Sequence, residues 1–228
     1  MRVLASSTVD KSTILWTVLK IVQMNSQELS PQPEKKRVLS PRREKNSVYR
    51  SREHLTPDEV TRLIEAAGER GRHRLRDRTL VLMMFRHGLR AGEAVNLRWD
   101  AVMFDSRSIS INRLKNGLSG VHPLQADELE ALMPLRQRYP HSFSVFVGER
   151  GQNMTTGAIA KMLQRAGAIA QLPLPVHPHM LRHSCGYYLA EQQLPTRDIQ
   201  EYLGHKNIQH TVRYTAANPA RFSRIQWV

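Results

Sequence analysis

Histidine and arginine side chains share one face of a predicted helix near the C-terminus. The helix begins at Pro178, because proline is well tolerated in the first turn of a helix. His179, Arg182 and His183 follow at positions i, i+3 and i+4, so they lie on the same face. A guanidinium can grip the oxygens of an anion through charge-assisted hydrogen bonds. This face therefore suits a phosphate-like anion better than a packed core.

Another histidine and a tyrosine follow on short, well-delimited helices. Thr196 is the predicted N-cap of the first of these helices, and Gly204 is predicted to end it. His205 comes directly after Gly204, and Tyr214 lies nine residues further on in another helical segment. A phenol with a pKa of about 10 is a weak nucleophile unless a base or nearby cations help it lose its proton. The cations and imidazoles of this region can provide that help.

Two more cations and one carboxylate extend the set. Arg90 follows a glycine turn and starts a short predicted helix, where the macrodipole disfavours a cation, so Glu93 or an anionic ligand is expected to compensate. Lys115 precedes Asn116-Gly117, the preferred two-residue turn of a β-hairpin, and is predicted at the hairpin tip. A lysine there is suited to protonate a leaving alkoxide. Taken singly, Arg90 also fits a surface arginine and Lys115 a solvated turn residue.

The elements that position these residues predict an α+β, mostly helical fold with one small antiparallel sheet. Residues 56–59 form a capping box that starts a helix, and hydrophobic spacing predicts further helices. One region alternates between apolar and polar residues instead, which indicates strands. The predicted strands are Trp99–Phe104, Ser108–Leu114 and Leu118–Leu124, and the predicted helices cover residues 57–68, 75–87, 90–97 and 125–138, with Pro134 ending or kinking the last, and a further helix capped by Thr155 or Thr156.

The composition indicates a polyanionic partner. The 228 residues carry a net charge of +14 and a sequence pI of about 10.6, which is typical of proteins that bind nucleic acid. The single cysteine, Cys185, excludes an internal disulfide framework and fits a reducing compartment. The apolar run from Ile14 to Val22 is far shorter than the roughly 20 residues that span a membrane.

A basic segment precedes the predicted folded domain. Residues 35–52 contain eight lysines and arginines against one acid, Glu44, and cannot bury enough apolar surface to order themselves. Two interpretations stay open, an arm that lies along DNA phosphates and a solvated linker. The arm interpretation makes DNA ligands of Lys35, Lys36, Arg37, Arg42 and Arg43.

The motifs together resemble one family. They are Gly-Leu-Arg90-x-x-Glu93, His179-Met-Leu-Arg182-His183, Leu-Gly-His205 and Tyr214, with Lys115 at the position of a hairpin lysine. This combination is similar to the signature of the tyrosine recombinase (phage integrase) family, and the short chain resembles the fimbrial phase-variation recombinases in particular. The resemblance covers residues 55–214. It implies an N-terminal extension and basic arm at residues 1–53 and a recombinase catalytic domain at residues 54–228.

The resemblance also implies a mechanism. Tyr214 would attack the scissile phosphate and form a 3′-phosphotyrosyl link, while Lys115 protonates the leaving 5′-oxygen. The phosphate would be held by Arg90, Arg182 and His205, with His179 assisting proton transfer and Glu93 supporting the site from behind. Neither ATP nor a metal would be needed. The implied partners are double-stranded DNA with inverted-repeat sites, three further copies of the chain in a tetramer, and accessory DNA-bending proteins, all in the bacterial cytoplasm at the nucleoid.

Three other interpretations are weaker. A zinc hydrolase would use the i, i+4 pair His179 and His183, but Met180 replaces the glutamate expected there and Arg182 would repel a cation. A non-catalytic DNA-binding regulator would not need every chemical residue of the set. A type IB topoisomerase shares the chemistry, and strand cleavage without exchange between sites would distinguish it.

The arm interpretation predicts a measurable change on deletion of residues 1–52. The slope of log affinity for DNA against log salt concentration should become shallower, by about 0.9 for each phosphate contact that is lost. Fluorescence anisotropy at several salt concentrations measures this slope for the full chain and the truncated one. An unchanged slope would refute the arm and leave the linker.

Overall fold

The computed structural model describes residues 52–114 and 117–216, and also Trp16, Leu19, Lys20, Phe222, Ile225 and Gln226. Residues 35–51 of the predicted arm and Lys115 therefore lie outside the described residues. The chain divides into two compact units, residues 1–44 and 45–228. In the first unit, the Lys20 Nζ lies 4.7 Å from the centre of the Trp16 ring. None of the helices in the described part of the chain has the length and hydrophobicity of a membrane span.

The predicted capping box starts the first helix of the larger unit, α3 (Pro57–Glu69). The Thr56 backbone N–H donates to the Glu59 carboxylate at 2.9 Å, and the Thr56 hydroxyl accepts from the Glu59 N–H. Arg52 donates to the same carboxylate at 2.7 Å. These bonds satisfy N–H groups that the first helical turn leaves unpaired. The helix then packs against α4 (Arg74–Arg86) and α7 (Thr156–Ile169).

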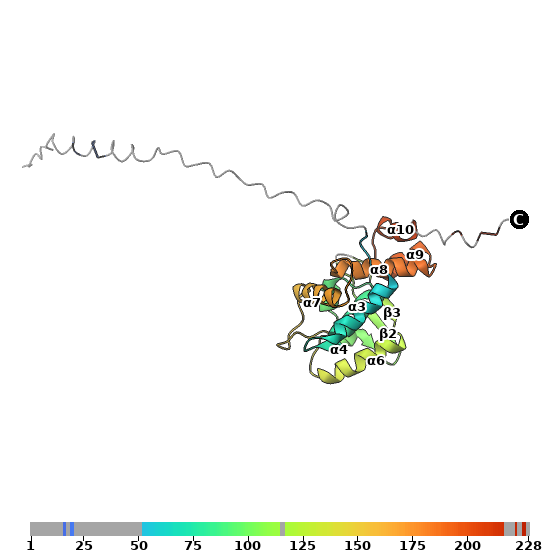
Figure 1. Ribbon diagram of the computed structural model, residues 1–228, viewed down its shortest axis with the longest axis horizontal. Coiled ribbons are helices and arrows are strands. Elements are labelled where there is room, and N and C mark those ends of the chain that lie inside the picture. Colours follow the sequence, from blue (N-terminus) through green and yellow to red (C-terminus); the bar gives the residue numbers. More distant parts are fainter. Residues whose placement is uncertain are drawn as a thin grey trace, which may run out of the picture. The chain divides into compact units, whose positions relative to one another are not determined.

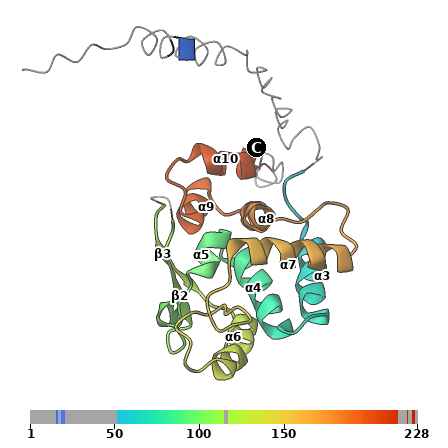
Figure 2. The same ribbon diagram turned by 90° about the vertical axis from the view of Figure 1, so that its left-hand side faces the viewer.

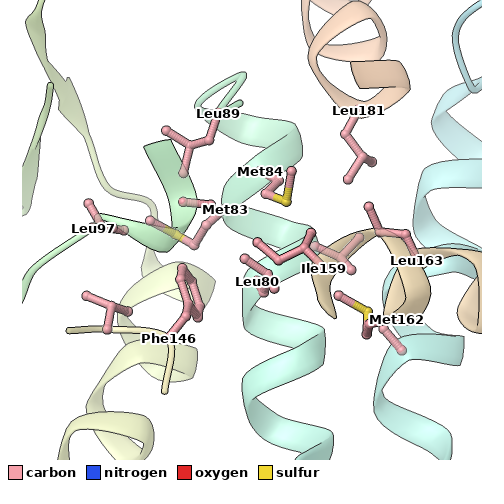
Figure 3. Packing of buried hydrophobic residues seen from close by; sticks show 14 of the residues in the cluster. Leu80, Met83, Met84, Leu89, Leu97, Phe146, Ile159, Met162, Leu163 and Leu181 are labelled. Atoms are coloured by element: carbon pink, nitrogen blue, oxygen red, sulfur yellow. The ribbon is translucent and has the colours of Figure 1, made fainter. Parts of the chain in front are cut away.

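The hydrophobic core surrounds α4, which runs through the middle of the unit (Figure 2). Leu80, Met83 and Met84 of this helix are fully buried. Figure 3 shows them between side chains of α7 on one side and Phe146 on the other, with Leu181 of α8 (Pro178–Glu191) above. Burying one such side chain contributes about 1.5–3 kcal/mol. The packing holds the C-terminal end of α4, and with it Gly88 and Arg90, in a fixed position against α8.

A three-stranded antiparallel sheet with the order β1-β2-β3 packs beside the helices, as predicted. Its strands are β1 (Val102–Met103), β2 (Ser108–Ile111) and β3 (Gly120–Pro123). The fold is mostly helical with this one small sheet among the described residues, so the predicted fold class is confirmed (Figure 1).

The strands are shorter than predicted, and the predicted turn at Asn116-Gly117 lies partly outside the described residues, because Asn116 is not among them. Pairing between β2 and β3 stops at Ile111 and Gly120, so the described residues 112–114 and 117–119 lie outside the ladder. Here the Arg113 backbone N–H donates to the Ser119 hydroxyl at 3.1 Å, and the Arg113 guanidinium bonds buried carbonyl groups. The first predicted strand also begins late, because residues 99–101 form a 3-10 helix.

The remaining helices follow the predictions closely. They are α5 (Ala91–Val95), α6 (Ala126–Arg138), α9 (Thr196–Leu203) and α10 (Gln209–Ala216). Helix α6 continues through Pro134 to its end. Gly204 ends α9 in the left-handed conformation with φ of 66°, as expected of a helix-ending glycine.

The predicted N-cap Thr196 is wrong by one residue. Pro195 occupies the cap of α9, and it leaves the Thr196 hydroxyl free of a capping role. That hydroxyl lies 2.9 Å from the hydroxyl of Thr215 instead. It therefore ties α9 to α10, and α10 also packs on α8. The three helices that carry the C-terminal motifs thus form one group at one end of the larger unit (Figure 2).

Candidate active site

A buried carboxylate organises one side of the candidate site. Glu93 is 4% exposed, and its Oε1 accepts from the Arg90 guanidinium at 2.6 Å while its Oε2 accepts from Arg113 at 2.9 Å. Backbone N–H groups of Arg90 and Leu114 donate to the same carboxylate at 3.0 and 3.3 Å. Burial opposes ionisation of Glu93, but these donors and the Arg113 charge outweigh it, so the pKa of Glu93 is lowered. Glu93 is the anion that compensates Arg90 at the helix start.

Arg182 is fixed by backbone carbonyl groups. Its two terminal nitrogens donate to the Gly88 oxygen at 2.7 Å and the Leu203 oxygen at 2.6 Å, and the side chain is almost fully buried. The Glu93 carboxylate lies 4.0 Å away. Burial and the nearby Arg113 charge lower the pKa of Arg182 to about 10, so the guanidinium remains charged at neutral pH. The carbonyl groups of Gly88 and Leu203 therefore fix the plane of the Arg182 guanidinium.

His205 is a neutral imidazole at neutral pH. Burial and the charges of Arg182 and Arg90 lower the pKa of His205 to about 3. Its Nδ1 lies 2.8 Å from the hydroxyl of Thr211, which is fully buried. Because Nδ1 is engaged by Thr211, the hydrogen bond leaves Nε2 as the ring nitrogen that can meet a ligand.

Tyr214 lies over α8 with its hydroxyl inside the protein. The residue is 2% exposed, and its Oη lies 2.9 Å from the Nδ1 of His183. A Cβ at position 186 would lie 2.5 Å from the phenol ring, so Gly186 makes the room that the ring occupies. The ring also stacks with that of His205 at a centre-to-centre distance of 6.3 Å. Burial raises the pKa of Tyr214 to about 12, although Arg182 opposes the effect.

His179 packs against His183, whereas the Tyr214 hydroxyl lies within hydrogen-bond distance of His183. Its ring meets that of His183 edge to face, with 4.8 Å between the ring centres. Desolvation and the charges of Arg182 and Arg90 lower the pKa of His179. Among the described residues, the hydrogen-bond partner of the Tyr214 hydroxyl is His183.

The structure therefore gathers all the predicted site residues that it describes, namely Arg90, Glu93, His179, Arg182, His205 and Tyr214. Lys115 lies outside the described residues, but the residues on each side of its segment are placed. Leu114 bonds Glu93, and a Cβ at Gly117 would lie 2.9 Å from the Gly204 oxygen. Leu114 and Gly117, which flank this segment, thus lie against the site.

Arg113 is not among the predicted site residues, although it belongs to the site. Its guanidinium is 1% exposed and bonds Glu93 together with the carbonyl groups of His87, Gly88 and Tyr202. The signal was present in the alternation of β2. Ile109 and Ile111 are buried, and Arg113 continues the same face two residues later, at 4% exposure. A buried arginine requires anionic or carbonyl partners, which this one finds at the site.

The family model described as Phage integrase family matches residues 53–221, which include every one of these residues. The chain belongs to this family. The type 1 fimbriae regulatory protein FimB of Escherichia coli (strain K12) is 43% identical over 178 residues, covering 76% of this chain and 88% of that protein. The type 1 fimbriae regulatory protein FimE of the same strain is 42% identical over 180 residues, covering 75% and 89%.

Solved recombinase structures share the fold. XerA recombinase is 26% identical with a TM-score of 0.67, covering 76% of this chain and 66% of its own. XerH site-specific recombinase, solved with its difH substrate, is 24% identical with a TM-score of 0.64, covering 75% and 53%. This chain therefore spans between half and two thirds of these two structures.

The protein is a tyrosine recombinase, an enzyme that acts on DNA at specific sites. The predicted family and the predicted enzyme class are confirmed. DNA is its partner class, in accordance with the strong positive charge.

Two buried histidines lie beside the site. The Nδ1 of His122 lies 3.1 Å from the Nδ1 of His87, and its ring stacks on Tyr202 with 3.9 Å between the centres. Burial and the neighbouring His87 and Arg113 lower the pKa of His122 to about 3. In the unfolded chain a histidine takes up its proton at a pH of about 6.5. As the pH falls below 6.5, the unfolded state binds this proton first, and the folded state loses stability.

We predict a loss of stability on acidification that His122 causes in part. Between pH 7 and pH 5 the free energy of unfolding should fall, with His122 contributing about 2 kcal/mol, at roughly 1.4 kcal/mol for each pH unit below 6.5. Urea denaturation at the two pH values measures the fall in the wild type and in His122→Gln. The fall should be smaller in the variant, and unchanged in the control His141→Asn, which alters an exposed histidine. An equal fall in wild type and His122→Gln would contradict the prediction.

Proposed function

We propose that this recombinase cleaves and rejoins DNA through a covalent link between Tyr214 and a 3′-phosphate. The observation that carries the proposal is the placement of a buried phenol beside a neutral imidazole and an oriented guanidinium, Tyr214, His205 and Arg182. A nucleophile, cations for the phosphate oxygens and a hydrogen-bonding imidazole are the groups that transfer of a phosphodiester requires.

In the proposed reaction, the Tyr214 hydroxyl loses its proton to an imidazole of the site as its oxygen forms a bond to the scissile phosphorus, while the bond to the 5′-oxygen breaks. Arg90 and Arg182 bind the non-bridging oxygens, where charge develops in the transition state, and His205 donates a hydrogen bond there from Nε2. Lys115 protonates the leaving 5′-oxygen. The 5′-hydroxyl of another strand reverses these steps, so the bond energy is conserved and neither ATP nor a metal ion is needed.

The biological role that we propose is inversion of a DNA element that controls fimbrial, phase-variable expression. Two relatives named type 1 fimbriae regulatory proteins, 43% and 42% identical, support this role. The proposed substrate is double-stranded DNA with inverted-repeat sites, bound by four copies of the chain with accessory DNA-bending proteins at the nucleoid in the cytoplasm. Residues 54–228 form the catalytic domain of the proposal, and residues 1–53 supply the extension and the basic arm.

Tyr214→Phe tests the proposed nucleophile. The substitution removes one oxygen and keeps the ring that packs over Gly186, so folding and DNA binding should survive. The covalent adduct should vanish. The adduct is measured by incubating the full chain with a nicked suicide duplex and separating the products by denaturing electrophoresis.

Tyr187→Phe is the matched control, because it removes a phenol oxygen from a ring that contacts Tyr214 edge to face. The control should retain the covalent band. A band that persists in Tyr214→Phe would remove Tyr214 from the mechanism.

A further inference from the structure

We propose that His183 accepts the hydroxyl proton of Tyr214 during strand cleavage and returns it during rejoining. The inference rests on the proposed role of Tyr214 as nucleophile. It assigns a catalytic role to a histidine to which neither the family resemblance nor the proposed function gives one, and it moves the tyrosine proton away from His179.

The contact that carries the proposal is direct. The Nδ1 of His183 lies 2.9 Å from the Tyr214 Oη, within the range of a hydrogen bond between a phenol and an imidazole nitrogen. Tyr214 is 2% exposed, so water has little access to its hydroxyl proton in this arrangement. A base that takes the proton must therefore come from the protein, and His183 already touches it.

The surroundings fix the geometry of the pair. Gly186 lies one turn along α8 from His183, and its missing side chain leaves the space in which the phenol ring sits. Tyr187 contacts this ring edge to face, with 5.0 Å between the ring centres. The phenol therefore meets His183 because two neighbours on the same helix place the ring there.

Burial and the charges that face His183 keep it neutral, which a proton acceptor requires. Burial together with His179, Arg213, Arg182 and His177 lowers the pKa of His183 to about 3. In the protein without DNA, the proton therefore stays on the phenol. A bound phosphodiester adds a negative charge beside Arg182, and this charge offsets the cations that oppose proton uptake by His183.

The proposed step balances. The Tyr214 O–H bond breaks as its proton moves to the Nδ1 of His183, and the oxygen forms the bond to phosphorus. The bond from phosphorus to the 5′-oxygen breaks, and that oxygen takes a proton from Lys115, the general acid proposed above. In rejoining, the phosphorus bond to the Tyr214 oxygen breaks, and His183 gives back the proton it received.

His183→Asn in the full chain separates proton transfer from simple positioning. The asparagine amide places a polar atom near the position of Nδ1, so it can hold the phenol but cannot take its proton. The rate constant for covalent complex formation on the nicked suicide duplex should fall about 10²–10⁴-fold, with DNA affinity unchanged. His141→Asn, the same substitution at an exposed histidine, should react at the wild-type rate.

A more acidic nucleophile provides the decisive readout. A fluorinated tyrosine incorporated at position 214 has a lower phenol pKa and depends less on a base. It should raise the cleavage rate of His183→Asn by a factor at least about tenfold larger than the factor by which it changes the wild-type rate. His183→Gln takes the place of His183→Asn if circular dichroism shows that the latter does not fold.

Two results would overturn the proposal. One is a His183→Asn rate within about threefold of the wild type, and the other is a large fall that the fluorinated tyrosine does not reverse. Loss of the covalent band in Tyr214→Phe, together with either result, would reject the role of His183 alone. A band that persists in Tyr214→Phe would instead reject the proposed nucleophile.

Discussion

The site depends on one buried ion pair network centred on the Glu93 carboxylate. A carboxylate that is 4% exposed is strongly disfavoured unless charged or N–H donors surround it, and Glu93 has Arg90, Arg113 and the Leu114 N–H. Removal of one partner from such a buried pair typically destabilises a protein by about 3–5 kcal/mol, because the other charge is left alone. Glu93 thereby determines where two guanidiniums can lie.

Arg113 spreads this constraint to the elements around it. Its guanidinium bonds the carbonyl groups at the end of α4 and the Tyr202 oxygen near the end of α9, in addition to Glu93. Arg182 bonds the Gly88 oxygen as well, and it bonds Leu203 in α9. Both arginines therefore join the end of α4 to the end of α9. His205 follows directly, so its position relative to Arg182 is set by the same carbonyl groups.

Local rules predicted the elements, and tertiary contacts decided the exceptions. The capping box at Thr56 and the left-handed Gly204 need only their own neighbours, and both were predicted. The glycine of Asn116-Gly117 indicated a tight turn, but a Cβ there would lie 2.8 Å from the Arg113 Cβ, so this glycine also allows close packing. A Cβ at Gly117 would also lie 2.9 Å from the Gly204 oxygen. Because Gly117 and Gly204 are far apart in the sequence, local rules cannot predict this contact.

Motif spacing predicts which residues form most of the candidate site, but it does not predict how their side chains pair. Arg90, Arg182, His205 and Tyr214 were identified because short helices bring them to one end of the fold. Spacing does not predict which imidazole bonds the Tyr214 hydroxyl, because His179 and His183 share one helix face. That choice depends on the rotation of α10 over Gly186, which only the packed structure determines.

The most direct test of the central claim is the single-turnover cleavage rate of Glu93→Gln. The substitution keeps the size of the side chain but replaces the charged carboxylate with a neutral amide. Arg90 and Arg113 therefore lose the anion that they bind. The account predicts a folded protein that binds DNA but cleaves it about 100-fold more slowly or worse, while the control Glu130→Gln, at an exposed position of α6, cleaves normally. A Glu93→Gln rate within about threefold of the wild type would contradict the account.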